Sequence, residues 1–437
     1  MNKDSETSID KHETKIMSFG RPNLVIGLTG PFGSGCSTMR QILASDEFGF
    51  KGFTISTHIR KELKDSGEII DKGDPGWRRI LQDHGDKKRE EDSAYWIKKV
   101  VNEIDNNGIN DKDEIVIDGF RNILEVQEIR KIYPNFFLVA VCAEREKRWS
   151  RVQNDYKGNQ SEFEDDDRRD QNEDLKWGQS VQKCVDDADY VYYNNEENTV
   201  TVGSSSKPNT NQIDRIFKKQ AKDFVPLMRG EMPCRDPKSE ELEITVAYAQ
   251  SHASRCIKRH VGAVITINKD SRELPISMGF NENPSGINTC KSENACYKDE
   301  NMSGKLEAKT QEICCPSCGK KYNNLKKPWI CEGCGANFKN WLFPNRNMVL
   351  CTAIHAEERA ILSLCGRSAE GGTIYVTTFP CFQCARLILD SGIKKIIYVE
   401  AYPVLETATF LRKNGVDVIP FTGFTSKGFF RVFPKVN

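Results

Sequence analysis

Two spacings of hydrophobic residues recur along this chain and predict its helices and strands. In the N-terminal half, short apolar runs predict buried strands, and the segments between them carry apolar residues at helical spacing. The predicted strands cover residues 24–28, 115–118, 136–141 and 190–193. Because strands and helices alternate, this half is predicted to form a parallel, doubly wound α/β sheet.

The C-terminal half combines the same spacings in a different order. Apolar residues recur at helical spacing over 242–252, and strand-like runs at 261–267 and 274–280 predict a hairpin. Further along, helices are predicted to begin at His355 and Pro380 and to alternate with strands at 373–379 and 394–400. The pattern predicts an α/β/α unit.

Changes in composition divide the chain into domains. The first 20 residues are polar and charged and predict a disordered leader. The expected parts are a first domain at 21–225, a linker at 226–238, a second domain at 239–437, and an insertion at 287–349 within the second domain.

The composition is that of a soluble globular protein, with 29% charged and 38% hydrophobic residues. No apolar run approaches the about 18 residues of a membrane span, and the polar N-terminus lacks the apolar core of a signal peptide. We therefore expect a cytoplasmic protein with no membrane partner. In that compartment, 16 cysteines favour metal sites and reduced thiols over a disulfide framework.

The formal net charge is zero, but it is unevenly distributed. Residues from 231 onward carry 27 basic and 21 acidic side chains, a net charge of +6, which leaves −6 on the first 230 residues. A mildly basic C-terminal half suits an anionic nucleotide, whereas a long nucleic-acid track usually needs denser clusters of Lys and Arg.

One histidine and two cysteines have the spacing of a catalytic zinc site. His355 begins one predicted helix, and Cys381 and Cys384 share a face in the first turn of the next. Three protein ligands leave the fourth position for water, whose pKa zinc lowers to about 7. Glu357 is predicted to carry protons without ligating the metal. A core histidine beside two unrelated thiols is the alternative, but H-x-E…P-C-x-x-C is the signature of zinc nucleobase deaminases.

Four more cysteines in the insertion predict a structural zinc site. Two C-x-x-C-G knuckles separated by 12 residues are typical of a zinc ribbon. The predicted ligands are Cys315, Cys318, Cys331 and Cys334. Cys314 competes with Cys315, but the glycine after Cys318 favours Cys315. The alternative, four reduced surface thiols, would leave reactive groups exposed without evident gain.

A glycine-rich loop follows the first predicted strand and resembles the phosphate-binding loop G-x-x-x-x-G-K-[ST]. The candidate nucleotide-binding residues are Gly30, Gly33, Gly35, Cys36, Ser37 and Thr38, with Asp118 at the end of a second strand. Loop amides can bind phosphates, and Ser37, Thr38 and Asp118 are placed to hold Mg²⁺. Cys36 occupies the lysine position, which argues against ordinary phosphoryl transfer. A strand-turn-helix corner kept only for folding is the alternative.

Residues 23–195 resemble the nucleoside monophosphate kinases, especially the deoxynucleotide and dephospho-coenzyme A kinases. The resemblance rests on the glycine-rich loop, on LQDHG at 81–85, on IDGFRN from Ile117 and on the FFLVAV strand. EDDDRR at 164–169 falls where such kinases carry a lid. A solvated, charged helix is the alternative for that segment.

Substrate contacts are predicted near the first hairpin of the second domain. The turn after Phe280 is expected to leave the Asn281 amide free for a sugar hydroxyl. Arg255, Lys258 and Arg259 are candidates for phosphate contacts, with ordinary surface charge as the alternative. Ala356, between the predicted ligand and the proton carrier, is also placed among the substrate contacts.

Over residues 240–420 the chain resembles the deoxycytidylate (dCMP) deaminases. The motifs are SRCIKRHVGAVI, GFNENPSG, HAEERAI, VTTFPCFQC and SGIKKIIYVEAY. The resemblance implies a mixed sheet flanked by helices and a 2′-deoxycytidine nucleotide substrate. It also implies that Asn281 contacts the sugar, that His355, Cys381 and Cys384 bind zinc, and that Glu357 shuttles protons.

The joined halves resemble the bacterial antiviral cytidine deaminases, which deplete deoxycytidine nucleotides during phage infection. This implies deamination of dCTP and/or dCMP, with the P-loop domain regulatory. The implied partners are a nucleoside triphosphate effector and a small regulatory RNA, and we expect a homo-oligomer. The alternatives are a deaminase of bases within RNA or DNA, and a nucleotide kinase or nucleotide-sensing regulator.

Overall fold

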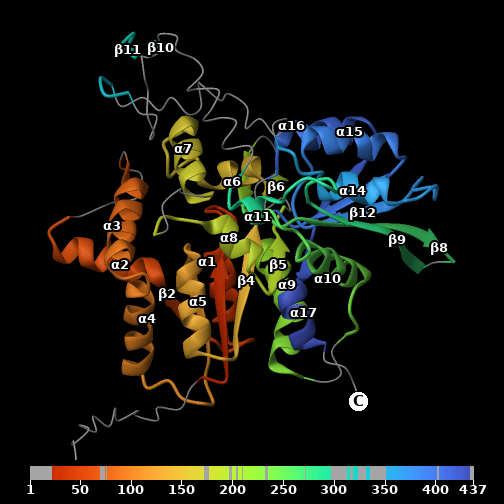
Figure 1. Ribbon diagram of the computed structural model, residues 1–437. Coiled ribbons are helices and arrows are strands. Elements are labelled where there is room, and N and C mark those ends of the chain that lie inside the picture. The colour runs from red at the N-terminus through yellow and green to blue at the C-terminus, as the bar shows by residue number, and fades with distance from the viewer. Residues whose placement is uncertain are drawn as a thin grey trace, which may run out of the picture. The chain divides into compact units, whose positions relative to one another are not determined.

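The computed structural model describes residues 22–68, 74, 76–171, 177–195, 199–202, 205–208, 210–231, 235–270, 272–296, 313–314, 318–322, 331–334, 351–400 and 403–433. These residues fall into two compact units (Figure 1). The N-terminal unit takes its residues from 1–187 and 194–232, and the C-terminal unit from 188–193 and 233–437.

A parallel sheet forms the core of the N-terminal unit. Its strands lie in the order β4-β1-β3-β2, and each neighbouring pair is parallel. The strands are β1 (Leu24–Thr29), β2 (Lys51–Thr54), β3 (Glu114–Phe120) and β4 (Phe136–Cys142). Every residue of β1 and β4 is buried, as a sheet covered on both faces requires. The predicted parallel α/β sheet is confirmed.

Helices connect and cover these strands. They are α1 (Cys36–Leu43), α2 (Ile55–Asp65), α3 (Trp77–Glu91), α4 (Tyr95–Asn106), α5 (Ile123–Ile132), α6 (Arg145–Val152), α7 (Gln160–Gln171), α8 (Val181–Asp186) and α9 (Thr210–Arg229). A small antiparallel hairpin, β6 (Thr199–Val202) and β7 (Ser205–Pro208), precedes α9.

Helix α9 corrects the predicted linker, which was placed at 226–238. Pro226 lies inside the helix, although its missing N–H removes one helical hydrogen bond. Buried Leu227 and Met228 follow it, and Arg229 forms a 2.6 Å ion pair with Glu114. These tertiary contacts extend the helix beyond the proline, so the predicted linker begins too early.

The C-terminal unit is built on a mixed sheet of order β14-β13-β12-β8-β9. The strands β8 and β9 form an antiparallel hairpin, β12 is antiparallel to β8, and β12, β13 and β14 are parallel. The bounds are β8 (Gly262–Lys269), β9 (Arg272–Phe280), β12 (Thr373–Val376), β13 (Lys395–Tyr398) and β14 (Asp417–Pro420).

Two glycines let helices approach opposite faces of the β8–β9 hairpin. A methyl group at Gly262 would lie 1.8 Å from the Ala247 carbonyl oxygen on α10 (Ser239–Ser251). A methyl group at Gly279 would lie 2.3 Å from the Ala356 carbonyl oxygen on α14 (Ala356–Leu362). Gly279 pairs with the residue after Gly262, so the two glycines face opposite ways. This arrangement gives the predicted α/β/α layers.

The remaining described elements complete the C-terminal unit. They are β5 (Tyr190–Tyr193), α11 (Cys290–Glu293), β10 (Ile313–Cys314), β11 (Lys321–Tyr322), α15 (Phe382–Asp390), α16 (Leu405–Lys413), β15 (Gly423–Phe424) and α17 (Ser426–Val432). Strand β5 pairs antiparallel with β15 and therefore clusters with this unit, although it comes from the N-terminal half of the sequence. Among the described residues, no helix is long and apolar enough to cross a membrane.

Candidate active site and nucleotide-binding loop

The structure brings together the three predicted ligands of the catalytic metal. His355 caps the N-terminus of α14, Cys381 caps that of α15, and Cys384 lies in the first turn of α15. His355 Nδ1 lies 3.3 Å from Cys384 Sγ and 3.4 Å from Cys381 Sγ. Zinc bonds of ordinary length to nitrogen and sulfur at a tetrahedral angle place those atoms about 3.5 Å apart. The donor atoms therefore fit one zinc ion.

The two cysteines influence one another strongly. A hydrogen bond from the Cys384 thiol, together with one from His355, lowers the pKa of Cys381 to about 4. Because a thiolate is the form that ligates zinc, this charge distribution prepares the cluster for a cation.

Glu357 lies at the metal-ligand cluster without belonging to the set of three donors. Its side chain is buried, with 4% of its surface exposed. Burial raises its pKa to about 7, while the nearby His355 and a hydrogen bond from Cys384 act in the opposite direction. A carboxylate with this pKa can both accept and release a proton near neutral pH.

The environment of Asn281 corrects one prediction. Its Oδ1 accepts a 2.8 Å hydrogen bond from the Val261 N–H, and its Nδ2 donates a 2.9 Å bond to the Arg259 carbonyl oxygen. Two of the hydrogen-bonding groups of this amide, its oxygen and one N–H, are therefore engaged, contrary to the prediction of a free amide, because the side chain joins the start of β8 to the end of β9. Its position is therefore fixed by the fold.

The other predicted substrate contacts differ in their surroundings. Arg255 and Lys258 are exposed. Arg259 is also exposed, but it forms a 3.1 Å ion pair with Glu400. Ala356 is fully buried at the start of α14, where only its backbone can face a ligand.

Glu400 is a residue of this site that the sequence analysis missed. It is 7% exposed and follows β13, and its Oε2 accepts a 3.0 Å hydrogen bond from the Phe379 N–H, two residues before Cys381. An acid directly after a buried parallel strand was the available signal, because ligand sites gather at the carboxyl ends of such strands.

Three of the four predicted ribbon cysteines also form a cluster. The sulfur atoms of Cys318, Cys331 and Cys334 lie within 4.8 Å of one another, and those of Cys318 and Cys331 are 3.5 Å apart. The strands β10 and β11 form an antiparallel pair and lie on either side of the first knuckle in the sequence. Cys315 lies outside the described residues. Three convergent sulfur donors fit the chemistry of a structural zinc site.

The glycine-rich loop has backbone conformations that only glycine adopts easily. Gly30 and Gly35 have φ angles of +148° and +112°, and Gly33 has one of +80°. The Ser37 hydroxyl donates a 2.9 Å hydrogen bond to Asp118, which joins the two groups predicted to hold Mg²⁺. Thr38 lies next to Ser37 in the first turn of α1.

The side chain at the lysine position of this loop has a different role. The Cys36 thiol donates a 3.4 Å hydrogen bond to the Thr29 carbonyl oxygen. Burial raises the pKa of this thiol well above its usual value, so it stays neutral. The loop therefore lacks the fixed positive charge that contacts the β- and γ-phosphates in P-loop enzymes.

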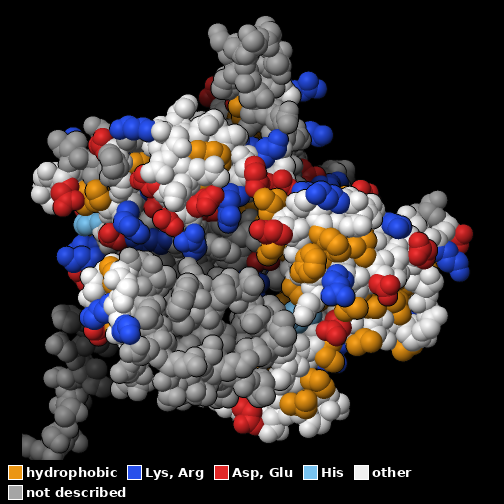
Figure 2. All heavy atoms as spheres, turned by 90° about the horizontal axis from the view of Figure 1, so that it is seen from above, with side chains coloured by type: hydrophobic (Ala, Val, Ile, Leu, Met, Phe, Trp, Pro, Cys, Tyr) orange, Lys and Arg blue, Asp and Glu red, His pale blue; other side chains and the backbone are white. Residues whose placement is uncertain are grey.

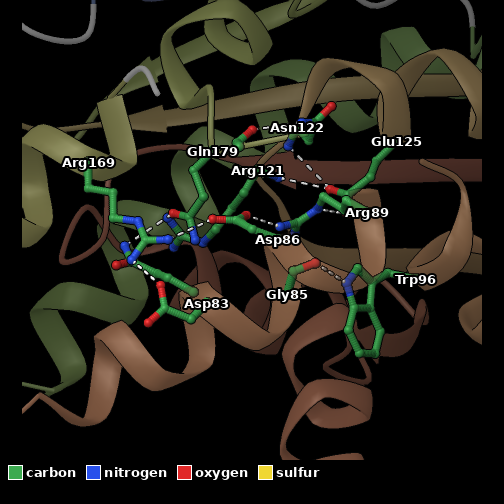
Figure 3. Close-up of polar contacts among 12 residues, drawn as sticks. Asp83, Gly85, Asp86, Arg89, Trp96, Arg121, Asn122, Glu125, Arg169 and Gln179 are labelled. Atoms are coloured by element: carbon green, nitrogen blue, oxygen red, sulfur yellow. Dashed lines mark hydrogen bonds and ion pairs between the residues drawn. The ribbon is translucent and has the colours of Figure 1, made fainter. Parts of the chain in front are cut away.

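A network of ion pairs joins α3 to α5 and α7 (Figure 3). Arg89 pairs with Asp86 and Glu125 at 2.9 and 2.8 Å, and Arg169 of α7 bonds Asp83 and Asp86 at 2.6 and 2.9 Å. Each of these arginines is therefore neutralised by carboxylates of its own chain.

Helix α7 contains the EDDDRR segment, and further ion pairs hold it against the rest of the N-terminal unit. Asp167 forms a bidentate pair with Arg148, at 2.6 and 3.0 Å, and Asp170 pairs with Arg121. Because Asp166, Asp167 and Asp170 are buried, the alternative prediction of a solvated charged helix is wrong.

Comparisons with known proteins match two parts of the chain. A family model described as the cytidine and deoxycytidylate deaminase zinc-binding region matches residues 237–400, and one described as an AAA domain matches residues 26–176. The deoxycytidylate deaminase of Enterobacteria phage T4 is 32% identical over 182 residues, 40% of this chain and 86% of the phage protein. That of Saccharomyces cerevisiae is 26% identical over 211 residues, 48% of this chain and 50% of the yeast protein.

A solved structure is also similar to part of the chain. The dCMP deaminase of the cyanophage S-TIM5, in its apo form, is 20% identical with a TM-score of 0.25, over 43% of this chain and 100% of that chain.

The ligand set, the carboxylate beside it and the matched zinc-binding region define a hydrolytic deaminase of nucleotides. The N-terminal unit, which the AAA-domain model matches over residues 26–176, is built on a parallel sheet with a glycine-rich loop after its first strand. The chain belongs to the deoxycytidylate deaminase family.

Proposed function

We propose that this protein deaminates deoxycytidine nucleotides, dCTP and/or dCMP, to the corresponding deoxyuridine nucleotides. The observation that carries the proposal is the convergence of His355, Cys381 and Cys384 beside the buried carboxylate of Glu357. The similarity to deoxycytidylate deaminases supports the substrate class.

The residues divide the chemistry between them. His355, Cys381 and Cys384 would hold zinc, which when bound lowers the pKa of water and so supplies hydroxide near neutral pH. Glu357 accepts the proton of that water and passes it to the ring nitrogen of cytosine. A C–O bond forms at C4, and Glu357 then takes the proton of the added hydroxyl and gives it to the amino group, so that the C–N bond breaks and ammonia leaves. One water is consumed for each ammonia released.

Other residues of the site bind and orient the nucleotide. Asn281 is held by Val261 and Arg259, and one N–H of its amide remains for a sugar hydroxyl. Arg255, Lys258 and Arg259 supply positive charge for the phosphates. Because Arg259 also pairs with Glu400, its contact with phosphate would compete with that ion pair.

The N-terminal unit is proposed to bind a nucleotide and regulate the deaminase. In this proposal Ser37 and Asp118, which share a hydrogen bond, would hold Mg²⁺, and the loop amides would hold phosphates. The neutral Cys36 thiol and the internally paired arginines argue against phosphoryl transfer. The second zinc, held by the ribbon cysteines, is proposed to be structural.

A deaminase of bases within RNA or DNA is the main competing function. Figure 2 shows Lys and Arg side chains interspersed with Asp and Glu on the face that it views. A nucleic-acid track would instead gather basic side chains along a groove. The side chains of described residues drawn on this face do not gather in that way.

An ammonia-release assay tests the proposal directly. Purified protein would be given cytidine, dCMP, dCTP, CTP and a cytosine-containing single-stranded oligonucleotide, with and without ATP or dTTP. We expect turnover of dCMP or dCTP. Release of ammonia from the oligonucleotide alone would replace the proposal with the competing function, and release from none of the substrates would end both. The biological role that we propose, depletion of dCTP during phage infection, would then be tested by measuring nucleotide pools in infected cells.

A further inference from the structure

The carboxylate of Glu400 has one oxygen atom for each of two partners in the candidate active site. Its Oε2 accepts a 3.0 Å hydrogen bond from the Phe379 N–H, and its Oε1 lies 3.1 Å from the Arg259 guanidinium. All three residues belong to the C-terminal unit. Because Glu400 is buried, water does little to screen these contacts. Glu400 therefore joins a candidate phosphate contact to the segment that precedes two metal ligands.

The Phe379 contact leads directly to a metal ligand. Residues 377–384 contain two of the three predicted ligands, and we call this segment the metal-ligand loop. Between Phe379 and Cys381 lies Pro380, whose ring locks one backbone dihedral. The Phe379 ring is buried and packs edge-on against the ring of Tyr398, with centroids 4.7 Å apart. The position of the Phe379 backbone therefore constrains the position of Cys381.

The Arg259 contact lies next to the candidate substrate contacts. The Arg259 side chain is 51% exposed, and its bond to Glu400 uses one of the five N–H donors of the guanidinium. The Arg259 carbonyl oxygen accepts a 2.9 Å hydrogen bond from the amide of Asn281, the candidate sugar contact. A phosphate can therefore reach the guanidinium, while the Arg259 backbone is held by the residue proposed to contact the sugar.

A phosphate on Arg259 changes the charge around the Glu400 carboxylate. The guanidinium compensates this carboxylate across 3.1 Å, and a phosphate group competes for the same positive charge. A carboxylate with less compensation is a stronger acceptor for its other donors, among them the Phe379 N–H. Phosphate on Arg259 therefore strengthens a hydrogen bond that holds the metal-ligand loop.

An effect of phosphate on the metal-ligand loop has a kinetic signature of its own. Binding energy from a part of the substrate that does not react can be used to orient the reacting groups, and a substrate without that part then loses kcat as well as affinity. A phosphate that only binds to Arg259 contributes equally to the ground state and the transition state, so its loss changes KM alone. The dependence of kcat on phosphate therefore distinguishes the two roles.

We infer that Glu400 is a positioning residue through which the substrate phosphate, bound to Arg259, orders the metal-ligand loop. Glu400 acts through Phe379 and Cys381 and takes no part in proton transfer. Its contact allows the deaminase to distinguish a nucleotide from a nucleoside in kcat. The inference rests on the proposed function for the substrate, whereas the contact between Glu400 and the loop can be tested without any substrate.

Steady-state kinetics of the full-length, zinc-loaded protein test this inference. The substrates are deoxycytidine and the nucleotide that is turned over, dCMP or dCTP. We expect the wild-type kcat to be at least about tenfold higher for the nucleotide, the effect of one charge-assisted hydrogen bond. Glu400→Gln keeps an oxygen for the Phe379 N–H but loses the charge that responds to Arg259. Its two kcat values should agree within about threefold, while KM stays lower for the nucleotide because Arg259 still binds phosphate.

Glu241→Gln is the matched control for the loss of a buried carboxylate. Glu241 is fully buried, accepts hydrogen bonds from the N–H groups of Lys238 and Phe424, and pairs with Arg235 at 2.7 Å, so its contacts are of the same kind but lie outside the metal-ligand loop. It should leave the ratio of the two kcat values unchanged. Three results would overturn the inference: equal kcat values in the wild type, a wild-type ratio in Glu400→Gln, or an equal loss of the ratio in Glu241→Gln.

Zinc retention tests the contact with the metal-ligand loop without substrate. Glu400→Ala removes the acceptor of the Phe379 N–H, so the catalytic zinc should be lost at an EDTA concentration about tenfold lower than in the wild type. Glu400→Gln should restore most of the retention. Cys381→Ser, which removes a ligand, identifies the step in the titration that belongs to the catalytic zinc.

The two measurements keep the inference separate from the proposed function. Wild-type zinc retention in Glu400→Ala would overturn the positioning role. Absence of turnover with every nucleotide counts against the proposed substrate instead, and zinc retention then decides whether Glu400 positions the loop. If Glu400→Ala does not fold, the kinetics of Glu400→Gln decide the matter.

Discussion

Replacing Glu357 with glutamine separates proton transfer from metal binding. The amide keeps the size of the side chain but can neither accept nor release a proton at neutral pH. Glu357 is 4% exposed and its carboxylate bonds the Cys384 thiol, so water cannot readily take its place. The substitution does not change any of the three donor residues, His355, Cys381 and Cys384, so the variant should still bind zinc.

The expected loss follows from the role of the carboxylate. A positioned general acid–base contributes about 10²- to 10⁴-fold to a rate, which corresponds to about 3–5 kcal/mol of transition-state stabilisation. Because Glu357 serves two proton transfers, we expect kcat with dCMP or dCTP to fall by about 10⁴-fold. Zinc content should stay equal to that of the wild type.

Ammonia release and zinc content by mass spectrometry of the metal together check this prediction. Glu358→Gln is the matched control, since Glu358 is the next residue, is only partly buried and lies outside the donor set. Its kcat should stay within about threefold of the wild type, as a residue without a proton-transfer role allows. Two results would refute the assigned role of Glu357. One is a Glu357→Gln variant whose kcat is a tenth or more of the wild-type value, and the other is a variant that has lost the catalytic zinc.

Three other substitutions test the structural framework. Cys331→Ser should remove the ribbon zinc, lowering zinc content by one ion per chain while dCMP turnover persists; unchanged zinc would argue against that site. Burial and the nearby Glu273 raise the pKa of Glu243 to about 7, so its carboxyl stabilises the fold at low pH, and this stability is lost as pH rises from about 4.5 to about 7. Glu243→Gln should therefore raise the free energy of unfolding at pH 8 by about 1–2 kcal/mol, the shift being discounted for screening by solvent, and change it little at pH 4, where an equal gain would contradict the assignment. Arg148→Met leaves the Asp167 carboxylate buried without this partner and should lower the free energy of unfolding, measured by urea denaturation, by about 3–5 kcal/mol. Adding Asp167→Leu should recover part of that loss. A loss below about 1 kcal/mol for Arg148→Met would show that the pair is dispensable.

The parts of the molecule that follow from local rules were predictable from the sequence. His355, Cys381 and Cys384 could be placed because each lies at the start of a helix that its own neighbours specify. The strands of the N-terminal sheet were found because β1 and β4 are buried along their whole length. In both cases the signal lies within a few residues of the feature.

The features that were missed depend on partners far along the chain. The Asn281 amide is engaged by Val261 and Arg259, about one hairpin away, and no local pattern reveals those bonds. The aspartates of α7 look like a solvated charge run until their arginines are known. Pro226 stays inside a helix because tertiary contacts outweigh its propensity.

The assignment of strand β5 to the C-terminal unit means that no single cut in the chain separates the two units. A fragment that begins at residue 235 would carry the deaminase site but lack the buried side chains of Tyr190–Tyr193. It would expose the edge of β15 and the ring of Phe424, which packs against Tyr190 with centroids 4.8 Å apart. Because residues 188–193 cluster with the C-terminal unit, gene truncation at residue 235 is a poor way to assign the activities of the two units.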